Sequence, residues 1–107
     1  MELKQYHVVW VNLDPTMGSE LRKTRPCLII SPDEMNRHLQ TLIVAPMTTT
    51  SKPYPTRVKV KYQQQTGWVV IDQIRTIARE RVIKVMGKIS KAEIAQVKEV
   101  IRETLVA

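Results

Sequence analysis

Runs of apolar, often β-branched residues alternate with polar, proline-containing segments over most of the chain, and this pattern predicts short strands joined by loops. At residues 57–62 the alternation is strict, so that Val58 and Val60 face one way and three basic residues face the other. Pro46 lies near the end of its run, where a missing N–H costs least. The expected strands cover residues 6–13, 26–31, 41–47, 57–62, 68–71 and 82–89, the last broken at Gly87.

The end of the chain changes to a helical period. Ser90 and Glu93 fit a capping box, in which a serine at the N-cap is followed three residues later by a glutamate. Apolar residues then recur at helical spacing, which predicts an amphipathic helix over residues 91–105. A short helical turn is expected within residues 32–40. Five to seven mostly antiparallel strands followed by this helix predict a small curled β-barrel with a C-terminal helix.

Length and composition are those of an ordinary globular protein. The 107 residues predict one domain over positions 1–107, with 43% hydrophobic and 25% charged residues. No segment reaches the roughly 18 apolar residues of a membrane span, and the first residues lack the pattern of a secretory signal. The absence of such a segment predicts no membrane partner. Because the single Cys27 cannot form an intramolecular disulfide, we expect a cytoplasmic protein.

Charge is unevenly distributed. The net charge is +7 and the isoelectric point is about 9.9. No acidic residue lies between Glu34 and Asp72, whereas this stretch holds several lysines and arginines, three of them on the strand at 57–62. A region of one sign favours polyanions such as nucleic acid. A basic surface that serves only solubility is the alternative that charge leaves open.

Metal and cofactor chemistry find no support in the sequence. His7 and His38 lie far apart, and there is no HExxH or CxxC spacing. The three glycines are dispersed and form no phosphate-binding loop, and no GxSxG motif is present. We therefore expect no metal site and no cofactor.

Polar residues stand at the margins of three apolar runs. Arg25 comes directly before the strand at 26–31, Thr48 directly after the strand at 41–47, and Asp72 directly after that at 68–71. A polar group at the edge of a buried segment needs a partner, so an internal ion pair is one explanation for each. All three together, beside two long polar loops, favour a functional site. Tyr54, in the second loop, is suited either to stack on a base or to anchor the loop.

Three motifs resemble the MazF/PemK/Kid toxin family. The first comprises Trp10 to Glu20 followed by Lys23 to Pro26, the second Pro46 to Thr49 with Tyr54-Pro55, and the third Asp72 to Ile77. They occur in the family's order and spacing over most of the chain. The resemblance implies an SH3-like barrel with a C-terminal helix, assembled into a two-fold homodimer. It also implies cleavage of single-stranded RNA at short sequences, and neutralisation by an antitoxin whose extended tail lies across the RNA channel.

The resemblance also assigns residues. It implies that Arg25 and Thr48 belong to the catalytic centre, that Glu20 lies near it, and that Asp72 matches the acid–base aspartate of the Kid branch. Two departures place the chain nearer the MazF branch. Val70 stands where Kid-type members have an arginine two residues before that aspartate, and Ser19 replaces a histidine of their first loop.

The chemistry of RNA cleavage without a metal constrains these roles. The 2′-OH of the substrate is the nucleophile, so the step needs a proton acceptor, charge stabilisation on the phosphorane and a proton donor to the leaving 5′ oxygen. Arg25 is suited to charge stabilisation, because its guanidinium is planar and permanently charged, whereas a pKa above about 12 makes it a poor base. Thr48 would hydrogen-bond a phosphate oxygen, and Glu20 and Asp72 are both candidate bases.

Sequence specificity is expected from the two loops, residues 14–24 and 49–56, because unpaired bases are read on their edges and by stacking. Basic residues in and near these loops would contact phosphates and make binding sensitive to salt. The predicted substrate-binding residues are Ser19, Arg22, Lys23, Thr49, Lys52, Tyr54, Arg57 and Gln73.

Two other functions remain open at this point. A gyrase-poisoning toxin is built on a similar barrel but acts on a protein and cleaves no RNA. A nucleic-acid-binding module that has kept the fold and lost the chemistry would bind RNA without product. The Arg25 and Thr48 motifs favour the nuclease over both.

Overall fold

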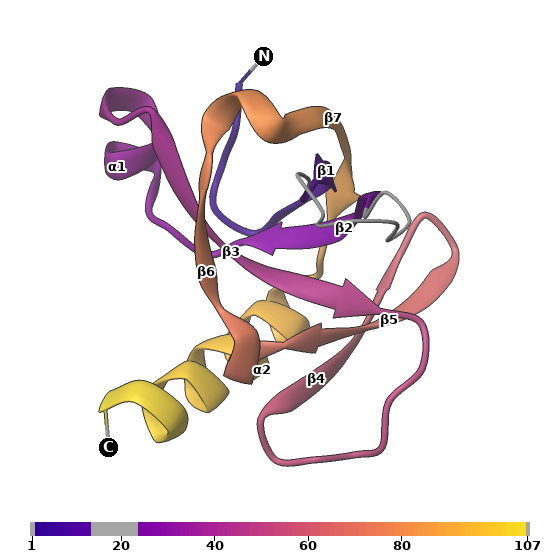
Figure 1. Ribbon diagram of the computed structural model, residues 1–107. Coiled ribbons are helices and arrows are strands. Elements are labelled where there is room, and N and C mark those ends of the chain that lie inside the picture. The colour runs from indigo at the N-terminus through magenta and orange to yellow at the C-terminus, as the bar shows by residue number, and fades with distance from the viewer. Residues whose placement is uncertain (1, 14–23, 107) are drawn as a thin grey trace, which may run out of the picture.

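A computed structural model of the chain describes residues 2–13 and 24–106. Within them, seven strands are followed by a helix near the C-terminal end (Figure 1). The strands are β1 (His7–Asn12), β2 (Thr24–Ile29), β3 (Thr41–Thr48), β4 (Arg57–Tyr62), β5 (Gln65–Val70), β6 (Arg75–Ala78) and β7 (Val82–Lys88). The helices are α1 (Asp33–His38) and α2 (Lys91–Ile101), with short helical turns η1 (Ile71–Gln73), η2 (Arg79–Arg81) and η3 (Arg102–Val106).

The strands form one curled antiparallel sheet in the order β4-β5-β3-β2-β1-β7, with β6 paired to β3 off this path. Strand β3 changes partner along one edge, from β6 at Thr41 to Val44 to β5 at Met47 and Thr48. Pro46 lies between these two ladders. The turn η1 joins β5 to β6 and therefore lies where β3 changes partner. This curled sheet with its C-terminal helix confirms the predicted fold class.

Alternation along the strands divides the core between two faces of the sheet. In β1, Val8 belongs to one cluster and Val9 to the other, and both are fully buried. The first cluster is covered by α2, whose Val97 is fully buried within it. The second lies on the opposite face and includes Cys27 and Val44. Burial of apolar surface on both faces holds the sheet in its curled form.

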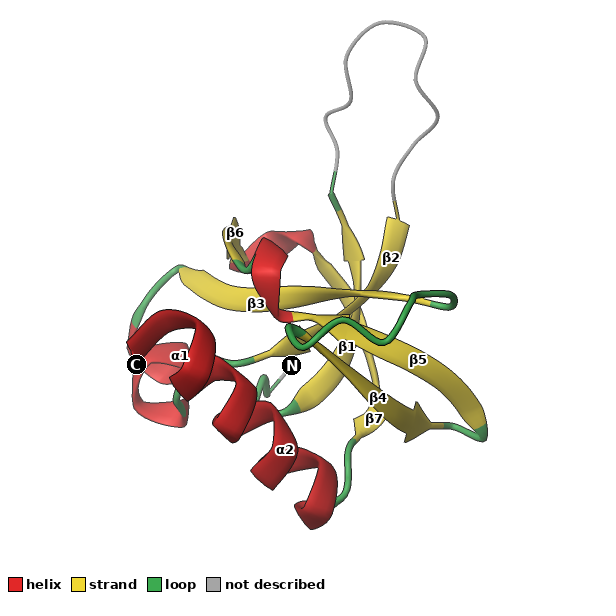
Figure 2. Cartoon of the chain, turned by 90° about the horizontal axis from the view of Figure 1, so that it is seen from below, coloured by secondary structure: helices red, strands yellow, loops and turns green. Residues whose placement is uncertain are grey.

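The capping box that begins α2 is confirmed. The Ser90 hydroxyl accepts a hydrogen bond from the backbone N–H of Glu93, and the Glu93 carboxylate accepts one from the backbone N–H of Ser90. The other oxygen of the same carboxylate accepts a bond of 2.7 Å from the backbone N–H of Lys61, which ties the start of α2 to β4 (Figure 2). The α-helix ends at Ile101, earlier than expected, and residues 102–106 continue it as a π-turn.

Strand bounds differ from the sequence prediction in several places. Strand β2 runs from Thr24 to Ile29, two residues earlier at each end than the predicted 26–31. Strand β5 begins at Gln65, because Gln63 and Gln64 adopt positive φ angles of 48° and 62° and form a tight hairpin turn without glycine or asparagine. Strand β6 was not predicted, since its four residues are too few to show a period. Strand β7 is not broken at Gly87, where φ is 155°, and the irregularity appears as shifts in its register with β1. None of the described helices is long and apolar enough to cross a membrane.

Candidate functional site

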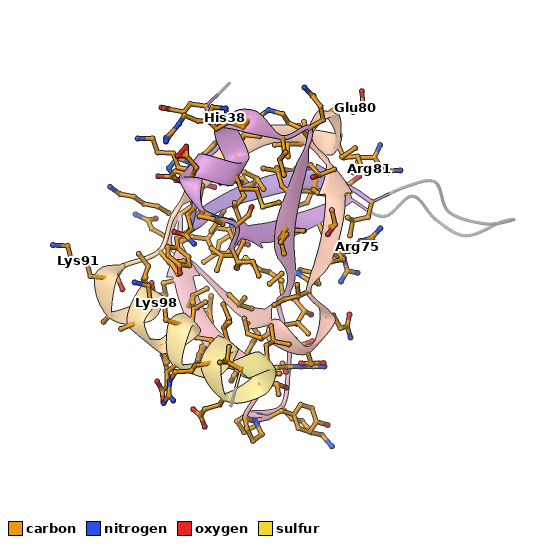
Figure 3. All side chains as sticks on the ribbon, turned by 90° about the vertical axis from the view of Figure 1, so that its left-hand side faces the viewer. His38, Arg75, Glu80, Arg81, Lys91 and Lys98 are labelled. Atoms are coloured by element: carbon orange, nitrogen blue, oxygen red, sulfur yellow. The ribbon has the colours of Figure 1, made fainter. Side chains whose placement is uncertain are left out.

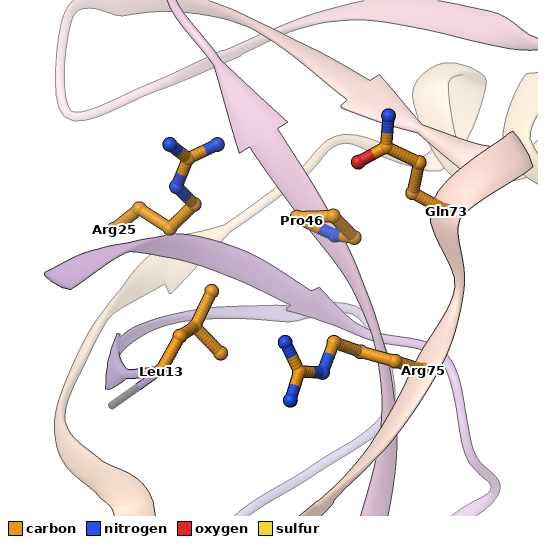
Figure 4. Close-up of a pocket in the computed structure, with 5 residues that line it drawn as sticks. All are labelled: Leu13, Arg25, Pro46, Gln73 and Arg75. Atoms are coloured by element: carbon orange, nitrogen blue, oxygen red, sulfur yellow. The ribbon is translucent and has the colours of Figure 1, made fainter. Parts of the chain in front are cut away.

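A pocket of about 240 Å³ opens where β3 changes partner. Four elements and one loop residue contribute to it, and Figure 4 shows the guanidinium groups of two arginines and an amide arranged around a central proline. The lining residues are Leu13 after β1, Arg25 on β2, Pro46 on β3, Gln73 on η1 and Arg75 on β6. The gap between the two ladders of β3 thus creates the space, and the neighbouring strands supply the charge.

The two arginines of the pocket both influence the pKa of one buried residue, Cys27. Burial raises the pKa of the Cys27 thiol to about 12, and the positive charges of Arg25 and Arg75 both oppose that rise. One buried group therefore lies in the field of both guanidiniums. Among the residues that the structure describes, neither guanidinium has a hydrogen-bond or ion-pair partner. Two unengaged guanidiniums at the mouth of one pocket are suited to bind a phosphate group.

Thr48 lies beside this pocket at the end of β3. It is two residues beyond Pro46 and so on the same face of the strand. Because Cys27 on β2 pairs with Pro46, the antiparallel register continues from that pair to bring Arg25 and Thr48 toward each other. The Thr48 hydroxyl donates a hydrogen bond of 3.1 Å to the carbonyl of Thr50. Its side chain is half-buried, and its oxygen can still accept a bond or turn to a ligand.

Asp72 does not line the pocket, although it directly precedes Gln73, which does. Its carboxylate accepts hydrogen bonds of 2.8 Å from the Thr56 hydroxyl, and of 3.3 and 3.4 Å from Nε and Nη2 of Arg57. These hydrogen bonds hold the pKa of Asp72 below its usual value, and the bond from Arg57 has the largest effect. Partial burial of the carboxylate acts in the opposite direction. A carboxylate stabilised in this way is a weak proton acceptor.

The lowered pKa of Asp72 gives a pH prediction with a defined sign. A depressed carboxyl pKa stabilises the fold above the pKa of the unfolded chain, and that contribution is lost as pH falls through the folded pKa. In an NMR titration we expect the Asp72 carboxyl to titrate below the 3.8 of a free aspartate, and to move upward in Arg57→Ala. Thr56→Ala should give a smaller rise, and an unchanged titration in Arg57→Ala would contradict the assigned cause.

Arg57 also organises the loop between β3 and β4. Its Nη1 donates a hydrogen bond of 3.1 Å to the Ser51 hydroxyl, and its guanidinium lies 5.1 Å from the centre of the Tyr54 ring. Tyr54 remains 48% exposed, and Thr49 and Lys52 of the same loop are exposed as well. The loop is therefore held from inside by one arginine, and its own polar and aromatic side chains face solvent.

Basic side chains occur on more than one side of the molecule. Figure 3 shows Arg75 and Arg81 on the side opposite to Lys91 and Lys98. Of the basic stripe on β4, Arg57 is engaged with Asp72, whereas Lys59 lies 5.9 Å from the centre of the Trp68 ring and is exposed, as is Lys61.

The predicted site residues fall into three groups. Arg25 and Gln73 meet in the pocket with Thr48 beside them, whereas Asp72, Arg57 and Tyr54 form a second cluster, with Thr49 and Lys52 in its loop. Glu20, Ser19, Arg22 and Lys23 lie outside the described residues. Within the described ranges, no three histidine, cysteine or carboxylate side chains are placed to hold a metal ion.

Arg75 is a pocket residue that the sequence analysis assigned to no site. It lies inside the third motif, residues 72–77, but was given no role there. The available signal was a charged residue within a short apolar stretch, next to Ile74. Only the pairing of β6 with β3, which sets Arg75 opposite Val44, shows that it reaches the same pocket as Arg25.

Comparisons with known proteins agree with this architecture. The endoribonuclease toxin MazF of Escherichia coli (strain K12) is 35% identical over 92 residues, which cover 85% of this chain and 83% of the relative. Endoribonuclease MazF9 of Mycobacterium tuberculosis is 36% identical over 106 residues, covering 88% and 89%. The crystal structure of MazE-MazF (Form-II) from Deinococcus radiodurans superposes with a TM-score of 0.86 at 26% identity, covering 98% of this chain and 96% of that one.

The family match covers nearly the whole chain. It spans residues 4–105 and belongs to the family described as PemK-like, MazF-like toxin of type II toxin-antitoxin system. The match therefore includes every element from β1 to α2, together with the pocket and the Arg57 cluster. On this evidence the chain belongs to the PemK-like, MazF-like family of type II toxin–antitoxin toxins.

Proposed function

We propose that this toxin cleaves single-stranded RNA at short specific sequences, without a metal ion, by attack of the substrate's own 2′-OH. Its relatives in Escherichia coli and Mycobacterium tuberculosis are endoribonucleases, and this chain has the same activity. The observation that carries the proposal is the pair of guanidiniums, Arg25 and Arg75, which have no partner among the described residues and lie at one pocket of about 240 Å³. Two guanidiniums match the charge of a phosphodiester, and each can bind its oxygens through parallel N–H groups.

The proposed step exchanges one P–O bond for another. The 2′ oxygen bonds to phosphorus as its proton passes to a base, and the bond to the 5′ oxygen breaks as that oxygen takes up a proton. The products are a 2′,3′-cyclic phosphate and a 5′-OH. Arg25 stabilises the charge on the phosphorane, and Thr48 donates a hydrogen bond to a non-bridging oxygen. Arg75 binds phosphate from the other side of Pro46.

Two carboxylates were candidates for the base. Asp72 is held by Arg57 and Thr56, and its pKa is lowered, so its contacts favour a positioning role over proton transfer. We therefore assign Glu20 as the stronger candidate, on the resemblance of its motif alone. Gln73, with its amide at the pocket, is suited to hydrogen-bond a base or sugar next to the scissile phosphate.

The proposed partners follow from the family. We propose that a cognate antitoxin neutralises this toxin, in line with the MazE-MazF complexes of Deinococcus radiodurans that share its fold. The tail of the antitoxin would cover the same positive pocket that binds RNA. We further propose that residues 1–107 form one domain, that two copies form a homodimer, and that the protein acts on mRNA in the cytoplasm to block translation.

Incubation of the purified protein with a long single-stranded RNA in excess EDTA tests the function. We expect discrete fragments with 5′-OH ends, unchanged in yield by the chelator, and mapping of those ends gives the recognition sequence. Activity that is lost in EDTA and restored by a divalent cation would overturn the metal-free mechanism. Intact RNA across several diverse substrates would favour a gyrase poison, or a silent binding module if the RNA is bound.

A further inference from the structure

Tyr54 is an exposed aromatic residue whose ring is contacted by the Arg57 guanidinium. The Arg57 guanidinium lies 5.1 Å from the ring centre, yet the residue as a whole is 48% exposed. An exposed aromatic ring of this size costs hydration free energy, and the loop buries it against no apolar neighbour in the two core clusters. An exposed ring with an ordered neighbour is suited to receive a planar group by stacking.

Arg57 is fixed before any ligand arrives. Two of its nitrogens bind the Asp72 carboxylate at 3.3 and 3.4 Å, and the third binds the Ser51 hydroxyl at 3.1 Å. Asp72 is in turn bound by the Thr56 hydroxyl at 2.8 Å. The guanidinium plane beneath Tyr54 is therefore set by three contacts from two segments of the chain. A support that is already ordered lowers the entropy cost of stacking a ligand on the ring.

The residues that hold Tyr54 are adjacent in sequence to the pocket on two sides. The loop that carries Tyr54 begins directly after Thr48, and Asp72 directly precedes the pocket residue Gln73. A backbone hydrogen bond of 3.0 Å from Ile71 to the carbonyl of Thr56 closes the end of the loop onto η1. A nucleic acid strand whose phosphate lies between Arg25 and Arg75 would therefore pass close to this loop.

We propose that Tyr54 is a stacking platform for one unpaired base of the RNA strand, near the scissile phosphate, and that Arg57 is the residue that positions it. This inference rests on the proposed ribonuclease function and adds a residue that binds a base of the substrate. The occupant is an RNA base, because the stretch from Glu34 to Asp72 contains no acidic residue between its ends and is basic. The charge of Arg57 is neutralised by Asp72, so Arg57 supports the ring. Phosphate is bound instead by Arg25 and Arg75, which have no partner among the described residues.

The first test uses a short RNA that contains the mapped cleavage site, with a 2′-deoxy group at the scissile nucleotide to block reaction. 5-Iodouridine is placed singly at each flanking position, and irradiated complexes are analysed by peptide mass spectrometry. We expect a crosslink to Tyr54 at one or two positions and none in Tyr54→Leu. Crosslinks that map elsewhere at every position would overturn the proposal.

Kinetics on the cleavable RNA provide the second test. Tyr54→Phe keeps the ring and should leave KM within about twofold, whereas Tyr54→Leu should raise KM about tenfold with kcat nearly unchanged, as expected for one lost base stack. Equal KM in the leucine variant would contradict a role for the ring.

A double-mutant cycle separates positioning from phosphate binding by Arg57. If Arg57 acts through Tyr54, Arg57→Ala should raise KM in the wild-type background and add nothing further in Tyr54→Leu. Arg57→Lys keeps the charge but loses the fork that binds Asp72, and should behave like alanine. Additive effects, or full rescue by lysine, would show that Arg57 acts on phosphate and would overturn its assigned role.

Failure of this inference is distinguishable from failure of the proposed function. Wild-type protein that leaves RNA intact under all conditions would remove the proposed function, and the inference with it. Wild-type protein that cleaves at defined sites while Tyr54→Leu cleaves identically would remove the inference alone. Circular dichroism and thermal unfolding of each variant check that the fold is kept.

Discussion

Replacing Arg25 with alanine is expected to abolish nearly all cleavage while RNA binding weakens only moderately. We expect kcat to fall by about 10²- to 10³-fold, the range for loss of one preorganised group that stabilises transition-state charge. The reason is geometric, because Arg25 reaches the pocket beside Thr48 and its guanidinium has no partner among the described residues. Its charge is therefore available to the phosphorane. Binding of an uncleavable 2′-deoxy substrate should weaken only several-fold, since Arg75 remains.

Two controls make the Arg25 result interpretable. Arg37→Ala removes an arginine from the exposed surface of α1, and should leave cleavage unchanged. Arg25→Lys keeps the positive charge but cannot bind phosphate through two parallel N–H groups, so its rate should lie between those of wild type and alanine. Initial rates on one mapped substrate, together with thermal unfolding, measure both effects. Full activity of a folded Arg25→Ala protein would refute the site assignment.

Six of the seven described strands and the C-terminal helix could be predicted because their signals are local. The strict alternation at residues 57–62 gives β4 with its exact bounds, and the capping box at Ser90 gives the start of α2. The hairpin turn at Gln63 and Gln64 could not be read, because its positive φ angles usually require glycine or asparagine. Tertiary pairing imposes that turn, and local propensity opposes it.

The candidate site was only partly accessible from sequence, for a similar reason. Arg25 and Thr48 were predicted as polar residues at strand margins and from the family motifs, and Gln73 as a substrate-binding residue within the third motif. Their convergence depends on the point where β3 exchanges β6 for β5, which is a property of strand pairing and has no local signature. The pairing of Arg57 with Asp72 across fifteen positions was equally hidden. A polar residue at a strand end can be predicted to belong to a site, but strand pairing in the sheet determines which residues lie next to it.

Arg75→Ala is expected to lower kcat/KM by about 10²-fold, with most of the loss in KM. Arg75 stands opposite Val44 on β3, four residues before Thr48, and so enters the pocket from the end away from Thr48. A guanidinium in that place holds the phosphate in the bound substrate and in the transition state to similar extents. Such uniform binding affects KM more than kcat, in contrast with Arg25.

The salt dependence of RNA binding distinguishes this role of Arg75 from a purely structural one. Each phosphate contact on a single strand contributes about 0.7 to the slope of log Kd against log salt concentration. Arg75→Ala should therefore lower that slope by about 0.7, measured with the 2′-deoxy substrate, whereas Arg37→Ala should leave it unchanged. A weaker Kd with an unaltered slope would mean that Arg75 shapes the pocket without contacting phosphate. In that case Arg25 would be the only guanidinium of the described pocket left to account for its affinity for RNA.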